Sequence, residues 1–247
     1  IANHGLIEVE MGKTLAEIVE NIGGGLKNNK KFKAIQLGGP AGSFITEQNL
    51  NLTIDYDELK NAGTFMGSGG IVVLDEDTCM VDLTKFYLNF IQHESCGKCI
   101  PCREGTQRMY EIIEKITKIP KDETSHQTLD RFKGVMQLEN IADVIKDTSL
   151  CGLGKNAANT FLSSLKWFRD EYEEHIFDRK CRAGVCKELR TFYIDVEKCT
   201  GCNACMRKCP VNAIIGTVKY PHFIVESKCI GCGICFETCK LSAIYIK

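Results

Sequence analysis

No apolar run in this sequence is long enough to cross a bilayer, and no signal peptide is recognisable at its start. These absences predict a cytoplasmic protein without membrane insertion. Positive and negative side chains are nearly balanced, with 31 Lys and Arg residues and 32 Asp and Glu residues. A formal net charge of -1 lacks the basic footprint of a polyanion-binding protein, so we expect no nucleic-acid partner. Since the first residue is Ile1 rather than Met, we expect a fragment of a longer chain.

Signatures of common active sites are also absent. The chain has no P-loop, no Ser–His–Asp order and no paired-carboxylate motif. The glycine-rich stretch GTFMGSGG, residues 63–70, precedes a predicted strand, whereas a Rossmann fingerprint follows a strand and opens a helix. Turns and close packing explain these glycines better than a dinucleotide site does. We therefore assign no catalytic residue.

Cysteine is present in unusual number, with 15 residues in a chain of 247. Disulfide scaffolds are usually secreted and much shorter, whereas here the count is odd and no export signal is recognisable. Most of these cysteines have C-x2-C spacing, which in an intracellular chain is typical of metal sites. The cysteines therefore predict bound metal.

The residue pattern changes three times along the chain, which predicts an α+β multidomain protein. A cysteine-free start is followed by a helical segment, a short hinge and a cysteine-dense end. The boundaries that we expect are 1–75, 76–176, 177–192 and 193–247.

The first two segments differ in the period of their apolar residues. The first contains predicted strands at 6–11, 32–37 and 70–75 and a helix at 14–22. In the second, apolar residues such as Phe86 and Phe90 recur three or four positions apart. That spacing predicts four amphipathic helices packed as a bundle.

The last segment contains an internal repeat. YIDVEKCTGCNACMRKCPVNAI (193–214) aligns with FIVESKCIGCGICFETCKLSAI (223–244), with all four cysteines in register. Each run has the C-x2-C-x2-C-x3-C spacing of two-cluster bacterial ferredoxins, in which the fourth cysteine ligates the other cluster. The repeat therefore predicts two [4Fe–4S] clusters, one held by Cys199, Cys202, Cys205 and Cys239, the other by Cys229, Cys232, Cys235 and Cys209. Paired zinc knuckles are the alternative.

Three further cysteines stand close together in ESCGKCIPCREG. Cys96, Cys99 and Cys102 need a fourth partner, and Cys151 in SLCGLG is the nearest downstream candidate. We expect helices after Cys102 and after Cys151, whose N-terminal amides would favour an anionic iron–sulfur core. Our interpretation is a third [4Fe–4S] cluster at the end of the helical segment, and the alternative is a four-cysteine zinc site.

The remaining three cysteines lie outside these motifs. Cys181 and Cys186 follow His175 at the end of the last predicted helix, and Cys79 lies near the start of the helical segment. Three thiols and one imidazole are a typical zinc donor set, so we interpret His175, Cys181 and Cys186 as ligands of a structural zinc in the hinge, with Cys79 as the fourth. In the alternative, Cys79 is a small buried apolar side chain and the other two are inert thiols.

These motifs carry a family resemblance. ESCGKCIPCREG with a distant SLCGLG resembles the flavin-containing NADH-oxidising subunit of respiratory complex I and its soluble relatives. MGKTLAEIVENIGGG, AIQLGGPAG and GSGGIVVLDEDTCMVD resemble the soluble-ligand-binding β-grasp domain of that family. The two-cluster ferredoxin segment is absent from the ordinary complex I subunit. It is typical of the β subunit of NADH-linked, often electron-bifurcating, iron-only hydrogenases of anaerobes and of related formate dehydrogenases.

The resemblance implies a function for the whole protein. FMN and NAD(H) would bind upstream of Ile1, and electrons would pass from FMN through the three [4Fe–4S] clusters to ferredoxin or a catalytic subunit. The implied partners are a thioredoxin-like [2Fe–2S] subunit, a catalytic hydrogenase subunit and free ferredoxin. A formate dehydrogenase subunit and a complex I-like NADH dehydrogenase are alternatives. A zinc-binding scaffold without redox function is an alternative of another class.

Overall fold

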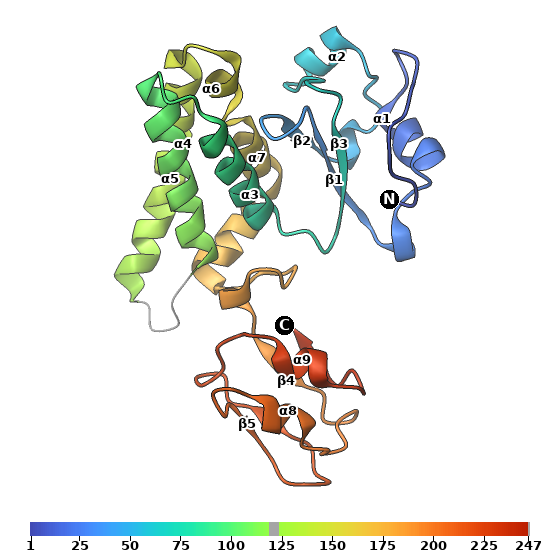
Figure 1. Ribbon diagram of the computed structural model, residues 1–247, viewed down its shortest axis with the longest axis vertical. Helices are drawn as coiled ribbons and strands as arrows, with labels where there is room; N and C mark the ends of the chain where they lie inside the picture. Colours follow the sequence, from blue (N-terminus) through green and yellow to red (C-terminus); the bar gives the residue numbers. More distant parts are fainter. Residues whose placement is uncertain (119–123, 247) are drawn as a thin grey trace.

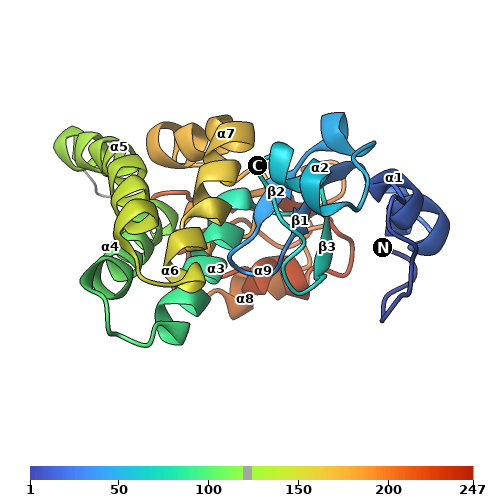
Figure 2. The same cartoon turned by 90° about the horizontal axis from the view of Figure 1, so that it is seen from above.

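The computed structural model describes residues 1–118 and 124–246. Three parts follow one another along the chain (Figure 1): a small sheet with short helices, a group of long helices beside it, and a cysteine-rich part below both. Seen from above, the long helices and the sheet lie side by side (Figure 2). Among the helices in these two ranges, none is both long and apolar enough to cross a membrane. The mixed helix-and-sheet organisation confirms the expected fold class at this level.

A three-stranded antiparallel sheet, in the order β2-β1-β3, organises the first part. Its strands are β1 (Phe32–Leu37), β2 (Ser43–Ile45) and β3 (Ile71–Asp75). The strands predicted at 32–37 and 70–75 are therefore confirmed, and β2 is an additional strand. The strand predicted at 6–11 is wrong, because this segment has no partner strand and its Leu6 side chain is fully exposed.

Short helical segments accompany the sheet. The predicted helix at 14–22 is confirmed as α1 (Leu15–Glu17) continuing into a π-helical turn (Ile18–Ile22). Thr14 begins it with a capping box, in which the Glu17 N–H donates to Thr14 Oγ1 at 3.2 Å and the Thr14 N–H donates to the Glu17 carboxylate at 2.9 Å. The other helical elements of this part are α2 (Tyr56–Asn61) and the 3₁₀ turns Lys27–Asn29 and Glu47–Asn49.

The second part is helical. Its helices are α3 (Met80–Glu94), α4 (Ile100–Thr117), α5 (Ser125–Thr148), α6 (Gly152–Asn156) and α7 (Asn159–Glu173), and α7 continues into a π-helical turn (Glu174–Asp178). Each of the four long helices contributes a fully buried side chain to one core, namely Leu88, Met109, Leu138 and Phe161. The sheet packs against this group, since the Phe44 N–H on β2 donates to Ser163 Oγ on α7 at 2.9 Å.

The spacing of the apolar residues in α3 predicts only part of the face that is buried. Phe86 and Phe90 are 62% and 44% exposed, whereas Leu88 and Ile91 are fully buried. Both sets have helical spacing, so contact with α4 and α7 decides which set is covered.

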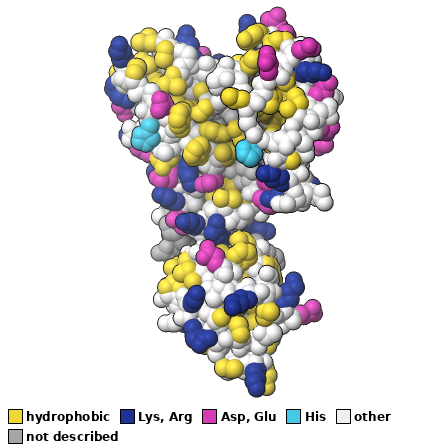
Figure 3. Space-filling model, turned by 45° about the vertical axis from the view of Figure 1, so that its right-hand side comes forward, with side chains coloured by type: hydrophobic (Ala, Val, Ile, Leu, Met, Phe, Trp, Pro, Cys, Tyr) yellow, Lys and Arg dark blue, Asp and Glu magenta, His cyan; other side chains and the backbone are white. Residues whose placement is uncertain are grey.

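The third part contains both halves of the sequence repeat. Its elements are β4 (Phe192–Ile194), α8 (Ala204–Lys208), β5 (Ile214–Ile215), β6 (Phe223–Ile224), α9 (Ile234–Thr238) and β7 (Ile244–Ile246), after a 3₁₀ turn at Lys187–Leu189. β4 pairs with β7 and β5 pairs with β6, both antiparallel. Each pair joins a strand of one half to a strand of the other, so the two halves form a single interlocked unit. This unit is the lower lobe in the space-filling view, where Lys and Arg side chains are scattered over the visible face (Figure 3).

Candidate metal centres

Two cavities in the third part are each lined by one of the predicted cysteine quartets. One cavity has a lining that includes Cys199, Cys202, Cys205 and Cys239. A second cavity has a lining that includes Cys209, Cys229, Cys232 and Cys235. Each cavity therefore combines three cysteines of one repeat half with the fourth cysteine of the other.

Backbone N–H groups point at sulfur beside both cavities. The Ala243 N–H donates to Cys239 Sγ at 3.4 Å, and the Ala213 N–H donates to Cys209 Sγ at 3.3 Å. Such bonds stabilise thiolate sulfur and tune the potential of a bound cluster. Burial raises the pKa of Cys235 to about 11, so this thiol keeps its proton until a metal cation replaces it.

Gly201 lets the first cysteine run lie against the following loop. Its φ is +70°, and an added Cβ would lie 2.4 Å from the backbone N and O of Tyr220. We expect Gly201→Ala to destabilise the third part by more than the cost of a left-handed backbone alone, about 1–2 kcal/mol. Iron content and thermal unfolding would measure the effect. Gly63→Ala is the matched control, because its φ is also left-handed, at +76°, and an added Cβ there meets no atom within 4 Å; equal losses in both variants would refute the prediction.

The third predicted quartet gathers where α4 and α6 begin. Cys99 is the residue before α4 and Cys102 lies in its first turn, while Cys151 is the residue before α6. A hydrogen bond from the Leu150 N–H lowers the pKa of Cys99, so the two distant segments are in contact here. Burial, and then the charges of Cys99, Cys151 and Cys96, raise the pKa of Cys102. The thiol of Cys102 therefore lies close enough to the other three to be affected by their charges.

One of the two helices at this quartet begins earlier than predicted. α4 begins at Ile100, so Cys102 belongs to the helix and does not precede it. Pro101 suits this position, because the first turn of a helix needs no N–H from it. At Gly154 an added Cβ would lie 2.5 Å from Ser149 and 3.2 Å from the Cβ of Cys102, so glycine allows α6 to pack closely against α4.

One contact of this quartet was not predicted from the sequence. Ser95 Oγ lies 3.3 Å from Cys102 Sγ. The available signal was its position beside Cys96 in the motif, but a serine there has no distinctive spacing.

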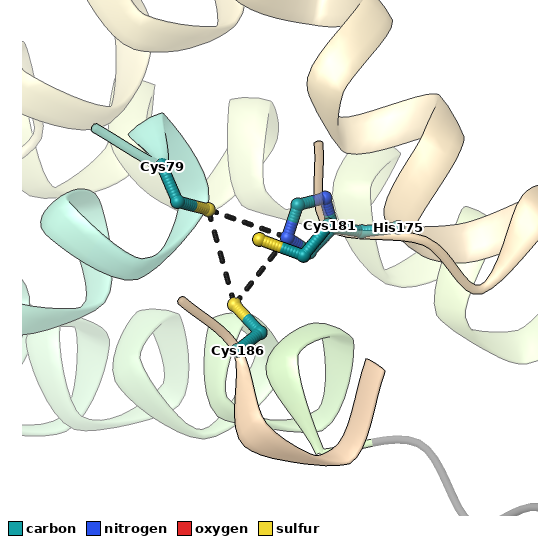
Figure 4. Close-up of side chains that lie close together, drawn as sticks. All are labelled: Cys79, His175, Cys181 and Cys186. Carbon is teal, nitrogen blue, oxygen red and sulfur yellow. Dashed lines mark hydrogen bonds between the residues drawn. The ribbon is translucent and has the colours of Figure 1, made fainter. Parts of the chain in front are cut away.

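The remaining predicted metal ligands come together in one buried group (Figure 4). The ligand atoms of Cys79, His175, Cys181 and Cys186 all lie within 4.8 Å of one another. Cys79 is the N-cap of α3, His175 lies in the π-helical turn after α7, and the other two lie in the loop that leads to the third part. All four are at most 3% exposed.

The distances between the donor atoms of this group suit a tetrahedrally coordinated zinc ion. Zn–S bonds of about 2.3 Å and Zn–N bonds of about 2.0 Å at tetrahedral angles imply S···S near roughly 3.8 Å and S···N near roughly 3.5 Å. The Cys79 and Cys186 sulfurs are 3.8 Å apart, and they lie 3.3 and 3.4 Å from His175 Nε2. No other group of three or more His, Cys, Asp or Glu donors in the described ranges is gathered in this way.

A backbone contact orients His175. Its Nδ1 donates to the carbonyl oxygen of Glu171 at 2.6 Å, which leaves Nε2 facing the sulfurs. Burial opposes a charge on this ring, but hydrogen bonds to Cys181 and Cys79 outweigh burial and raise the pKa of His175 to about 10. A metal that binds here must displace this proton and those of the thiols, so its affinity falls as the pH is lowered.

Comparison with known protein families finds a match for each of two regions of the chain. The NADH-ubiquinone oxidoreductase-F iron-sulfur binding region matches residues 82–175, which contain the quartet of α4 and α6. Residues 82–175 of this chain are therefore similar to the iron–sulfur region of the F subunit of NADH-ubiquinone oxidoreductase. A 4Fe-4S dicluster domain matches residues 191–240, which contain both quartets of the third part. The chain is therefore a [4Fe–4S] protein, and Cys79, Cys181 and Cys186 lie outside both matched regions.

Proteins similar to this chain include hydrogenase and respiratory subunits. The chain is 49% identical to the NADP-reducing hydrogenase subunit HndC of Solidesulfovibrio fructosivorans, over 90% of this chain and 44% of the relative. It is 39% identical to the F 2 subunit of NADH-quinone oxidoreductase from Rhizobium meliloti, over 72% of this chain and 40% of that protein. The chain thus spans less than half the length of these relatives.

A solved structure shares the fold. An NAD+-reducing [NiFe]-hydrogenase in the H2-reduced state aligns over 67% of this chain and 26% of the hydrogenase chain, with a TM-score of 0.54 and 23% identity.

Proposed function

We propose that this chain is an electron-transfer module with three [4Fe–4S] clusters. The ligand sets are Cys96, Cys99, Cys102 and Cys151; Cys199, Cys202, Cys205 and Cys239; and Cys229, Cys232, Cys235 and Cys209. The strongest support is that each of the two cavities in the third part is lined by one complete cysteine quartet. Bound clusters would supply one-electron transfer, and the protein would set their potentials through N–H···S bonds, burial and charge.

We further propose a structural zinc held by Cys79, His175, Cys181 and Cys186. The support is the tetrahedral spacing of four buried donors. The ligands come from the start of α3, the end of α7 and the loop before β4, so the ion would hold the hinge at 177–192 to the helices.

For the whole protein, we propose the β subunit of an NADH-linked, electron-bifurcating hydrogenase. The support is the 49% identity to a hydrogenase subunit together with the dicluster segment. FMN and NAD(H) would bind in a further domain, and the partners would be a thioredoxin-like [2Fe–2S] subunit, a catalytic hydrogenase subunit and ferredoxin. The proposed domains are a β-grasp (1–75), a cluster-bearing four-helix bundle (76–176), the zinc hinge and the two-cluster domain (193–247).

Iron content tests the electron-transfer proposal. Reconstituted protein should hold about twelve irons per chain, because it would carry three four-iron clusters. Cys99→Ala should lower this to about eight and remove one reduced-cluster signal from the electron paramagnetic resonance spectrum. Cys186→Ser is the matched control, since loss of a proposed zinc ligand should leave the iron content unchanged. Colourless protein that folds without iron would instead support the zinc scaffold.

The subunits that co-purify with the full-length protein test the proposal for the enzyme. An iron-only hydrogenase subunit is expected. A molybdenum or tungsten subunit would refute the hydrogenase and favour a formate dehydrogenase.

A further inference from the structure

A buried ion pair joins the sheet to the helices close to the four-donor group. Lys33 on β1 places Nζ 2.6 Å from Glu171 Oε1 on α7. The Lys33 side chain is 11% exposed and that of Glu171 is 1% exposed. Charges this far from water are costly when unpaired, so loss of either partner would leave the other as an uncompensated buried charge.

The pair holds the peptide units on both sides of Cys79. Lys33 Nζ donates to the carbonyl oxygen of Thr78 and lies over the ring of Phe168, 5.7 Å from its centroid. The second carboxylate oxygen of Glu171 accepts the Met80 N–H at 3.0 Å. Thr78 and Met80 flank Cys79 in the chain, so its backbone is held from the sheet side and from the helix side.

Glu171 also determines how a second donor points. Its carbonyl oxygen accepts the Nδ1–H of His175, which turns Nε2 toward the sulfur of Cys79. Glu171 thus holds the backbone next to the Cys79 thiol at the N-cap of α3 and orients the imidazole that follows α7. Neither Lys33 nor Glu171 offers an atom to the four-donor group itself.

We propose that Lys33 and Glu171 are positioning residues for a metal ion bound by Cys79, His175, Cys181 and Cys186. This inference depends on the proposed metal site. It extends that site into the sheet, so that metal affinity depends on a lysine of β1. By linkage, metal binding stabilises the contact between sheet and helices to the same degree.

Zinc competition measurements on the iron-replete chain test the inference. Lys33→Met should lower zinc affinity about 10–100-fold, the usual effect of removing a group that orients a ligand. Lys33→Arg, which keeps the charge, should restore part of the affinity. Lys31→Met is the matched control, because Lys31 lies just before β1 with an exposed side chain, and it should bind zinc as the wild type does.

Glu171→Gln keeps the test decisive if Lys33→Met fails to fold. Glutamine is nearly the same size and can still accept the Met80 N–H, but it removes the negative charge opposite Lys33. Its Co²⁺ complex should show weaker or shifted thiolate-to-metal absorption, a signal that a purely structural ion pair would not change. Unchanged metal affinity and spectra in folded Lys33→Met or Glu171→Gln would overturn the inference. Wild-type protein that binds neither zinc nor Co²⁺ would instead overturn the metal site itself.

Discussion

Cys186→Ser is expected to abolish zinc binding and to lower the thermal midpoint by about 10–20 °C. Structural zinc contributes about 10 kcal/mol or more in small zinc modules, and a loss of half that amount corresponds to such a shift in a protein of this size. The donors Cys79, His175 and Cys181 would remain buried without a cation between them. Zinc analysis and calorimetry of the purified protein would measure both effects.

A neighbouring residue provides the control for this experiment. Val185→Ser changes the same loop, but its side chain is 37% exposed and is not among the donors. It should keep zinc and stay within a few degrees of the wild-type midpoint. Wild-type amounts of zinc in Cys186→Ser would end the zinc proposal.

Pairs of cysteine substitutions are expected to reveal how the two cysteine runs share their clusters. If Cys239 completes the quartet of Cys199, Cys202 and Cys205, then Cys239→Ala combined with Cys202→Ala removes a single cluster, about four irons. Cys239→Ala combined with Cys232→Ala removes both clusters of the third part, about eight irons. Iron counts of the two double variants would decide the question.

The comparison is well matched, because Cys202 and Cys232 occupy equivalent repeat positions and both are exposed. An uncrossed arrangement would give the reverse result, with the larger iron loss for Cys239→Ala with Cys202→Ala.

The sequence was most informative where spacing alone carries meaning. The repeat predicts equivalent elements in its two halves, and α8 and α9 occupy equivalent positions there. The strands at 32–37 and 70–75 and the Thr14 cap were also readable, because they depend on neighbouring residues. Residues 6–11 show the limit of such patterns, since an alternating sequence forms a strand only beside a partner.

Contacts between distant segments could not be predicted in the same way. Cys79 was the weakest of the expected metal ligands, because nothing near it in sequence suggests His175, yet the two are 3.3 Å apart. Lys33 and Glu171 belong to no motif, and their pairing appears only once the sheet packs on α7. A single lysine on a strand would otherwise be taken as a solvated side chain.

The pairing of β4 with β7 and of β5 with β6 has a consequence for biosynthesis. The first strand of the duplicated unit cannot find its partner until the last one has left the ribosome. Nascent chains should therefore expose the earlier cysteines to oxidants and to competing metals throughout translation of the unit. Once assembled, neither half can separate without breaking the strand pairs that it shares with the other.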